Sequence, residues 1–138
     1  MSTEYGLTLL GQKASAQRRL ETFPSRSRPG ALSVTLECQE FTCRCPVTAQ
    51  PDWARITIEY VPDQRIVESK SLKLYLETFR EEGIFHEHLV QVLLDDFVAA
   101  AQPLSCTVSA CFNVRGGIAI TARVSYTKGP AAGKEEVR

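Results

Sequence analysis

Apolar and polar residues alternate along four stretches of this chain. These stretches are residues 32–38, 55–60, 104–114 and 118–126. Successive side chains of a strand point to opposite faces of its sheet, so a period of two predicts a strand with one buried face. Gly116 and Gly117 separate the last two stretches and suit a tight turn between antiparallel strands. The pattern therefore predicts four strands, of which the last two form a hairpin.

The period changes to 3.6 between the second and third stretches. Apolar residues recur at helical spacing from Ser69 to Glu82, ahead of Gly83, and again from Phe85 up to Pro103. Apolar residues at i, i+3, i+4 and i+7 lie on one face of a helix. The order is therefore strand, strand, helix, helix, strand, strand. We expect an α+β domain in which an antiparallel four-stranded sheet carries both helices on its apolar face.

The two ends of the chain differ in composition from its middle. Residues 1–30 mix Gly, Pro, Ser and Arg with one small apolar cluster, and the last dozen residues are small or charged. We therefore predict an N-terminal arm over residues 1–30, a single domain over residues 31–128 and a flexible tail over residues 129–138. The open edges of the predicted sheet need covering, which favours association between subunits.

Composition excludes several classes of partner. The 138 residues are 43% hydrophobic and carry 16 basic and 16 acidic side chains, so the formal net charge is zero. This balance provides no basic footprint for nucleic acid. The sequence contains no apolar run long enough to span a bilayer and no signal-peptide pattern, and its five cysteines are an odd number. We expect a soluble cytoplasmic protein with reduced thiols.

The candidate chemistry begins in residues 41–53. Cys45 and Asp52 stand seven residues apart, with Pro46 and Pro51 between them. Each proline disfavours the α region for the residue before it, which predicts a stiff loop. Such a loop could present a thiol nucleophile and a proton donor to one ligand. The alternative is a buried structural thiol at Cys45 and a turn-forming Asp52, and the residues by themselves leave both open.

Anion-binding chemistry is possible at the start of the first predicted helix. Glu68 and Ser69 stand where free N–H groups and the helix dipole favour anions. Lys70 and Lys73 lie three residues apart on one stripe of that helix and could hold phosphates. The alternative for both lysines is a solvated helix face.

His86 and Glu87 open the second predicted helix. The imidazole could relay a proton near neutral pH, and the carboxylate could accept N–H donors from a flat heterocycle. The alternatives are a surface imidazole and a capping carboxylate. The spacings of the cysteines and histidines match no usual zinc pattern, so we expect no metal site. Without a G-x-G-x-x-G motif, any dinucleotide would have to bind without a Rossmann unit.

Four motifs, taken together and in order, resemble a known family. They are residues 45–52 (CPVTAQPD), 68–75 (ESKSLKLY), 85–87 (FHE) and 115–118 (RGGI). Their sequences and separations are similar to those of the NADPH-dependent 7-cyano-7-deazaguanine reductases, the nitrile reductases of queuosine biosynthesis. The similarity extends from about Leu9 to Tyr126, and the length resembles the short, single-module branch. The resemblance implies the tunnelling fold, in which such units assemble into rings.

The resemblance also implies a mechanism. Cys45 would add to the nitrile carbon as a covalent thioimide, Asp52 would act as the acid/base, and His86 would assist. Two hydrides from two NADPH molecules would then give the aminomethyl product. This expected reaction requires no metal.

The remaining motif residues would bind the substrate and the cofactor. Glu68 and Glu87 would hold the N–H edge of the deazaguanine, and Val67, Ser69 and His86 would also lie at the substrate. The residues expected at NADPH are Lys70 and Lys73, from the lysine motif, and Arg115, a phosphate contact on charge grounds.

This sequence departs from the family pattern at two positions. Ala49 stands where glycine is usual in the loop, which predicts a slight change in the backbone. Leu89 stands where some relatives have a cysteine, so a protective disulfide from that position to Cys45 is not available. Neither departure removes a catalytic group.

Two other functions share parts of this pattern. An amidine-forming relative uses the same cysteine on the same nitrile but takes ammonia instead of hydride, and it resembles the reductases less in the lysine motif. Lys70 and Lys73 therefore favour reduction. A non-catalytic purine- or pterin-binding ring protein would need Glu68 and Glu87, but not Cys45 with Asp52.

Overall fold

The structure, a computed structural model, describes residues 17–129 of the chain. The first 16 residues of the predicted arm and the predicted tail from residue 130 onward lie outside the described residues. The elements, in order, are β1 (Thr22–Pro24), β2 (Val34–Arg44), β3 (Pro51–Val61), β4 (Arg65–Val67), α1 (Ser69–Glu77), α2 (His86–Ala101), β5 (Ser105–Phe112) and β6 (Thr121–Thr127).

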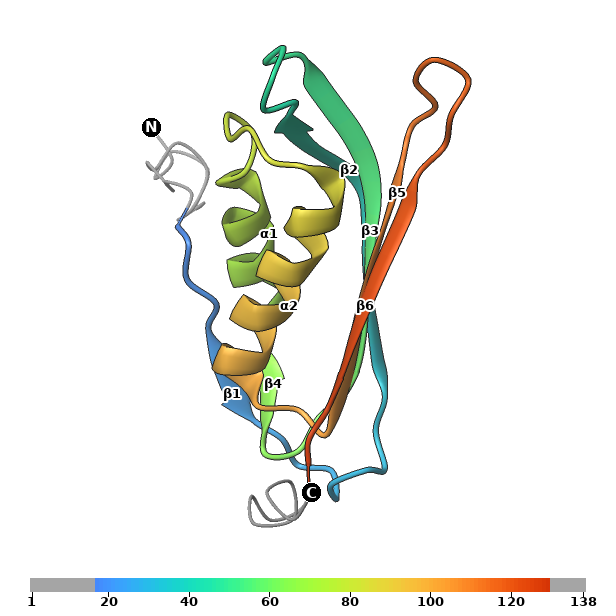
Figure 1. Cartoon of the computed structure of the whole chain (residues 1–138). Coiled ribbons are helices and arrows are strands. Elements are labelled where there is room, and N and C mark those ends of the chain that lie inside the picture. The colour runs from blue at the N-terminus through green and yellow to red at the C-terminus, as the bar shows by residue number, and fades with distance from the viewer. Residues whose placement is uncertain (1–16, 130–138) are drawn as a thin grey trace, which may run out of the picture.

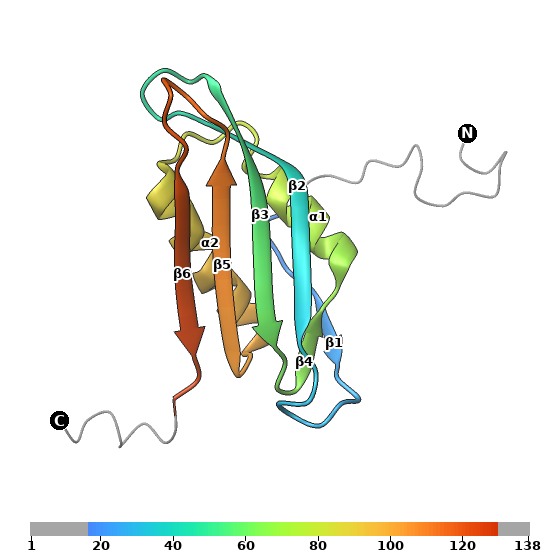
Figure 2. The same ribbon diagram turned by 90° about the vertical axis from the view of Figure 1, so that its right-hand side faces the viewer.

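Four of these strands form one antiparallel sheet in the order β2-β3-β5-β6. Both helices lie on the same face of this sheet (Figure 1), and in the part of the chain that the structure describes its other face carries no helix (Figure 2). A period of two produces this asymmetry, because every second side chain is apolar and needs a cover. The predicted α+β architecture is confirmed.

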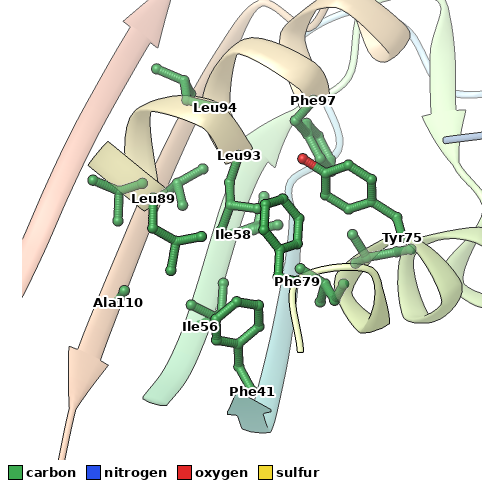
Figure 3. Close-up of a cluster of buried hydrophobic side chains, with 14 of the residues drawn as sticks. Phe41, Ile56, Ile58, Tyr75, Phe79, Leu89, Leu93, Leu94, Phe97 and Ala110 are labelled. Carbon is green, nitrogen blue, oxygen red and sulfur yellow. The ribbon is translucent and has the colours of Figure 1, made fainter. Parts of the chain in front are cut away.

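The core lies between the sheet and the two helices (Figure 3). Ile56 and Ile58 of β3 face Phe79, which follows α1, and Leu93 of α2, and all four side chains are buried. Burying side chains of this size contributes about 1.5–3 kcal/mol each. The phenol of Tyr75 crosses between the helices and donates a hydrogen bond of 2.5 Å to Asp96. The helices are therefore held to the sheet by apolar packing and to each other by a polar contact as well.

The predicted loop over residues 41–53 is too long. The strands β2 and β3 extend into it from both sides, so that only residues 45–50 lie outside the sheet. The pairing of β2 with β3 shifts by a β-bulge between Cys38 and Phe41. A bulge adds a residue to one strand and so changes which side chains face inward beyond it. Phe41 and Cys43 therefore join the core, and the strand continues through a segment whose alternation the sequence did not reveal.

The first helix is shorter than predicted, since α1 ends at Glu77 and not at Glu82. Beyond Tyr75 the backbone switches to tighter i→i+3 hydrogen bonds, with Thr78 N–H donating to Tyr75 O at 3.1 Å and Glu82 N–H to Phe79 O at 3.0 Å. The Thr78 hydroxyl also donates to Tyr75 O at 2.6 Å. In a longer helix, this carbonyl would accept the i→i+4 hydrogen bond instead. Hydrogen bonding around Thr78, not Gly83, ends the helix.

Residues 17–30, expected as part of the arm, contact the domain at several points. Strand β1 pairs antiparallel with β4. Glu21 N–H donates to the Ser71 hydroxyl oxygen at 2.9 Å, and the Arg18 guanidinium lies 3.8 Å from the centroid of the Phe79 ring. These contacts hold the segment along α1.

Candidate active site

Three connections meet at one end of the molecule. The β2–β3 loop, the segment that leads into α2 and the β5–β6 loop all lie at this end, as both views show (Figures 1 and 2). We call this region the reactive end, defined by Cys45, Asp52, His86 and Arg115. The predicted catalytic residues and one predicted cofactor residue are thus brought to the same end.

The loop after β2 is folded around Cys45. Cys45 N–H donates to Gln50 O at 2.8 Å, and Ala49 N–H donates to Cys45 O at 2.9 Å. Thr48 N–H points at the Cys45 sulfur, with a distance of 3.5 Å from N to Sγ. Hydrogen bonds from the side chain and backbone of Thr48 and from the backbone of Val47 lower the pKa of the Cys45 thiol, while desolvation and the charge of Asp52 oppose them. Donors to the sulfur stabilise the thiolate, which is the nucleophilic form.

Cys43 lies two residues earlier in an opposite environment. It is fully buried, and it faces Asp52 across the β2–β3 ladder. Burial, with the nearby negative charge of Asp52, raises the pKa of the Cys43 thiol to about 12. Cys43 is therefore a core side chain, and of the two neighbouring cysteines only Cys45 is suited to attack a substrate.

Asp52 is the buried acid of the site, with only 2% of its surface exposed. It lies in β3, not in a loop, so its side chain points in with the core. Each carboxylate oxygen has a partner: Arg115 Nη1 donates to Oδ1, and His86 Nε2 lies 3.2 Å from Oδ2. A buried carboxylate needs such partners, because an unpaired charge away from water is costly.

His86 is held by two contacts as the first residue of α2. Its ring stacks on Phe112 with centroids 3.6 Å apart and planes 7° apart, and its Nε2 faces Asp52. Only 15% of the side chain is exposed. A fixed imidazole beside a buried carboxylate can pass a proton between that carboxylate and a ligand.

The segment before α2 packs against the Cys45 loop. Arg44 N–H donates to Glu82 O at 2.9 Å, and Ile84 N–H donates to Arg44 O at 3.0 Å. Gly83, between these contacts, lies so close that a Cβ there would be 3.0 Å from the Pro46 Cα. Gly83 thus permits the loop to pack against this segment, a role that its position after a helical pattern did not reveal.

Ala49 adopts a left-handed backbone conformation, with φ of 63°. The Arg44 guanidinium donates to its carbonyl at 2.8 Å and holds it there. The loop therefore has a conformation that suits glycine, and alanine adopts it with a strain of about 1 kcal/mol.

Three of the predicted substrate residues, Val67, Glu68 and Ser69, lie at the start of α1, away from the reactive end. Glu68 is the N-cap of α1, where its carboxylate accepts from Ser71 N–H at 2.8 Å and from Lys70 N–H at 3.0 Å. Val67 is buried and donates its N–H to the Tyr60 hydroxyl at 3.1 Å, and Ser69 is exposed. A nine-residue helix is about 14 Å long. The structure of one chain therefore does not bring these residues to Cys45.

The two lysines of the predicted cofactor motif open onto different hollows. Lys73 lines a groove of about 460 Å³ between α1 and β2, together with Arg80 and three glutamates. Lys70 lines a smaller hollow of about 230 Å³ with Arg19 and Glu68. Glu87, by contrast, is exposed in the first turn of α2 at the reactive end.

Thr48 and Phe112 belong to the site but were not identified from the sequence. Thr48 stands three residues after Cys45, a spacing at which a turn can aim an N–H at the sulfur, so its signal was present. Phe112 carried no signal beyond an apolar position in a strand. Within residues 17–129 no group of three or more metal-ligating side chains is found, and no helix is long and apolar enough to cross a membrane.

The chain is similar in sequence to a known protein family and to several of its curated members. The sequence model of the family described as QueF-like protein matches residues 51–131. The chain is 57% identical to the NADPH-dependent 7-cyano-7-deazaguanine reductase of Syntrophus aciditrophicus over 88% of its own length and 87% of the relative's. It is 56% identical to the reductase of the same name from Frankia casuarinae, over 88% and 97% of the two chains.

One solved structure has a similar fold. It is an archaeosine synthase QueF-Like in the apo form, which matches with a TM-score of 0.65 over 71% of this chain and 96% of that one. The sequence identity is 22%, so the likeness concerns the fold alone.

Proposed function

This chain belongs to the QueF-like protein family, and on that premise we propose that it reduces 7-cyano-7-deazaguanine to 7-aminomethyl-7-deazaguanine with NADPH, in the biosynthesis of queuosine for tRNA. The observation that carries the proposal is the reactive end. There an accessible thiol with a lowered pKa stands beside a buried carboxylate that contacts an imidazole. Such a set suits addition to a nitrile, which needs a thiolate and a proton source.

In the covalent step, the Cys45 sulfur attacks the nitrile carbon. A carbon–sulfur bond forms, one π bond between carbon and nitrogen opens, and the nitrogen takes a proton, so nothing is expelled. Asp52 accepts the thiol proton and returns it to the nitrogen. The hydrogen bonds that Thr48 and Val47 direct at the sulfur support its thiolate form before attack.

Reduction of the nitrile to an amine takes four electrons, which two NADPH molecules supply as two hydrides. After the first hydride reaches the carbon, the carbon–sulfur bond breaks and Cys45 leaves as a thiolate. The second hydride completes the amine, and each new N–H proton comes through the pair formed by Asp52 and His86. Both groups are fixed in place, which favours repeated proton transfer at the same atom.

For the cofactor, we assign Lys73 and Lys70 to the phosphates. Lys73 and Arg80 both line the α1–β2 groove, and cationic side chains suit a phosphate group. Arg115 was also predicted as a phosphate contact, and its ion pair with Asp52 supports a different role, considered below.

For the substrate, we assign the heterocycle edge to Glu87 and to Glu68 with Val67 and Ser69 of a neighbouring copy. The two glutamates lie near opposite ends of α1 in one chain, so a single flat heterocycle can meet both only where two copies come together. This arrangement requires a homo-oligomer, for which the tunnelling fold provides rings and the open strands β2 and β6 provide edges. We also place the protein in the cytoplasm, where its free thiols would stay reduced.

The test is nitrile-dependent loss of NADPH absorbance, followed by intact mass spectrometry with the nitrile alone. We expect turnover in the first assay, and in the second a mass gain of one whole substrate on Cys45. An amidine-forming enzyme would instead need ammonia and leave NADPH unchanged. A non-catalytic binding protein would give neither turnover nor adduct, and that result would refute the proposal.

A further inference from the structure

Arg115 contacts the buried carboxylate that the proposed reaction uses for proton transfer. Its Nη1 donates to Asp52 Oδ1, while His86 Nε2 faces Oδ2 at 3.2 Å. The Asp52 side chain is 3% exposed and that of Arg115 is 43% exposed. The guanidinium thus reaches from the surface to an acid that water hardly touches, and it contacts the oxygen that the imidazole leaves free.

The backbone that carries Arg115 is built to hold it in this place. Arg115 and Ile118 exchange two N–H···O bonds of 3.0 Å, and Gly116 and Gly117 between them have φ of 58° and 80°. Two central residues with positive φ make a tight hairpin turn, whose twist matches that of the flanking strands. A Cβ on either glycine would meet nothing within 4 Å, so the backbone conformation and not crowding requires glycine.

The same hairpin is attached to β3 beside Asp52. Asn113 N–H donates to the carbonyl of Trp53, the residue after Asp52, at 3.0 Å. Phe112, one residue earlier, carries the stacked His86 ring. The end of β5 and the turn that follows therefore hold both partners of the Asp52 carboxylate.

We propose that Arg115 is a positioning residue that orients the Asp52 carboxylate toward His86 and the nitrile nitrogen during the covalent step. The proposal rests on the function proposed above. Arg115 itself gains and loses no proton: the thiol proton passes to Asp52 and then to nitrogen while the sulfur–carbon bond forms. Since this step precedes any hydride transfer, the role of Arg115 does not depend on NADPH. A residue that contacts the NADPH phosphates would instead affect the later hydride transfers.

The test measures the rate at which the nitrile alone adds to the protein, followed by intact mass spectrometry. We compare wild type with Arg115→Ala, Arg115→Lys and, as a matched control, Arg123→Ala, which changes an exposed arginine on β6. Misplacing a reacting group by about 1 Å costs on the order of 100-fold, so Arg115→Ala should slow adduct formation to that extent. Arg115→Lys should recover part of the rate, because it keeps the charge but loses the planar fork. Arg123→Ala should react at the wild-type rate.

A second measurement separates positioning from cofactor binding. In steady state, Arg115→Ala should lower kcat and leave the KM for NADPH unchanged. In an Asp52→Asn background, adding Arg115→Ala should cause little further loss of adduct rate, because both changes affect the same carboxylate. Additive losses would overturn the proposal, as would a raised KM for NADPH with a normal adduct rate.

The double variant serves as the control for loss of folding. If Arg115→Ala is destabilised by the unpaired buried carboxylate, Asp52→Asn/Arg115→Ala should regain the melting temperature, and its adduct rate should equal that of Asp52→Asn alone. If wild type forms the adduct and Arg115→Ala forms it equally fast, the positioning role of Arg115 is refuted and the proposed reaction is not. No adduct in wild type refutes the proposed reaction as well.

Discussion

The reactive end and the start of helix α1 use polar side chains differently. At the reactive end, Asp52, His86 and Arg115 come from three separate segments and contact one another across the fold. At the start of α1, the carboxylate of Glu68 accepts hydrogen bonds from its own helix, two and three residues ahead. The first arrangement is tertiary and the second is local.

This difference separates proton-transfer chemistry from substrate recognition. One chain assembles a thiol, an acid and an imidazole at one end, which is enough for addition to a nitrile. It does not bring Glu68 to them, although the resemblance of the motif implies that Glu68 binds the same substrate. On the proposed function, the chemistry would be complete within a copy and recognition of the substrate would be completed between copies.

The largest expected effect comes from removing the nucleophile. Cys45→Ala should abolish both the adduct and the turnover, because no other group at the reactive end can form the carbon–sulfur bond. The matched control is Cys43→Ala, which removes a buried sulfur and should keep the adduct. Turnover that persists in Cys45→Ala, or an adduct found on Cys43, would place the chemistry elsewhere.

The same pair of cysteines should differ strongly in their response to pH. The pKa of Cys45 is lowered, so its thiolate should form below the pH at which an ordinary thiol ionises, and its alkylation rate should level off early. The pKa of Cys43 is raised to about 12, so this group should stay a thiol through pH 9. Iodoacetamide labelling at pH 7, read by peptide mass spectrometry, should favour Cys45 by more than about 100-fold. Equal labelling would contradict the assignment.

Mixed oligomers test whether the two ends meet between copies. Cys45→Ala and Glu68→Gln should each be inactive, but subunits of the two variants assembled together should regain about a quarter of wild-type activity by random pairing. The matched control is Cys45→Ala with Asp52→Asn, which damages the reactive end of every copy and should regain nothing. Failure of the first mixture, with proven mixing of subunits, would show that the site lies within one chain.

A smaller effect is expected where the reactive end rests on the segment before α2. Gly83→Ala would place a Cβ 3.0 Å from the backbone of Pro46 and push the Cys45 loop outward. We expect a stability loss of about 1–3 kcal/mol, as for other overpacked positions, and a fall in kcat of about tenfold from the displaced sulfur. Thermal melts and adduct rates would measure both. Val47→Ala, on the exposed face of the same loop, should keep its melting temperature.

The smallest effect concerns the strained alanine of the loop. Ala49→Gly should relieve strain at a φ of 63° but should also raise the entropy of the unfolded chain, leaving a net gain of about 0.5 kcal/mol. The melting temperature should rise by roughly 2 °C, with adduct formation unchanged. A lower melting temperature would mean that the left-handed conformation carries no strain here.

The sequence by itself determined the order of the two helices and of the four strands of the main sheet, but not the short strands β1 and β4. Alternation over residues 55–60 and 104–112 and the helical period before Pro103 arise from local geometry, so they can be read without knowing what packs against what. It also marked Cys45, Asp52 and His86, because residue type limits the chemistry available. The positive φ values of the glycine turn at residues 116–117 follow the same local logic.

Only the tertiary structure decided which of two neighbouring cysteines lies in the core. If the alternation of residues 32–38 had continued, position 43 would have fallen on the polar face, but the bulge between Cys38 and Phe41 turned Cys43 into the core. Pairing with β3 and packing under the helices set that register, and neither is a property of the local sequence. The partnership of Asp52 with Arg115, 63 residues away, has the same origin. Long-range contacts of this kind exist only once the sheet has formed, because they join side chains that the chain order keeps apart.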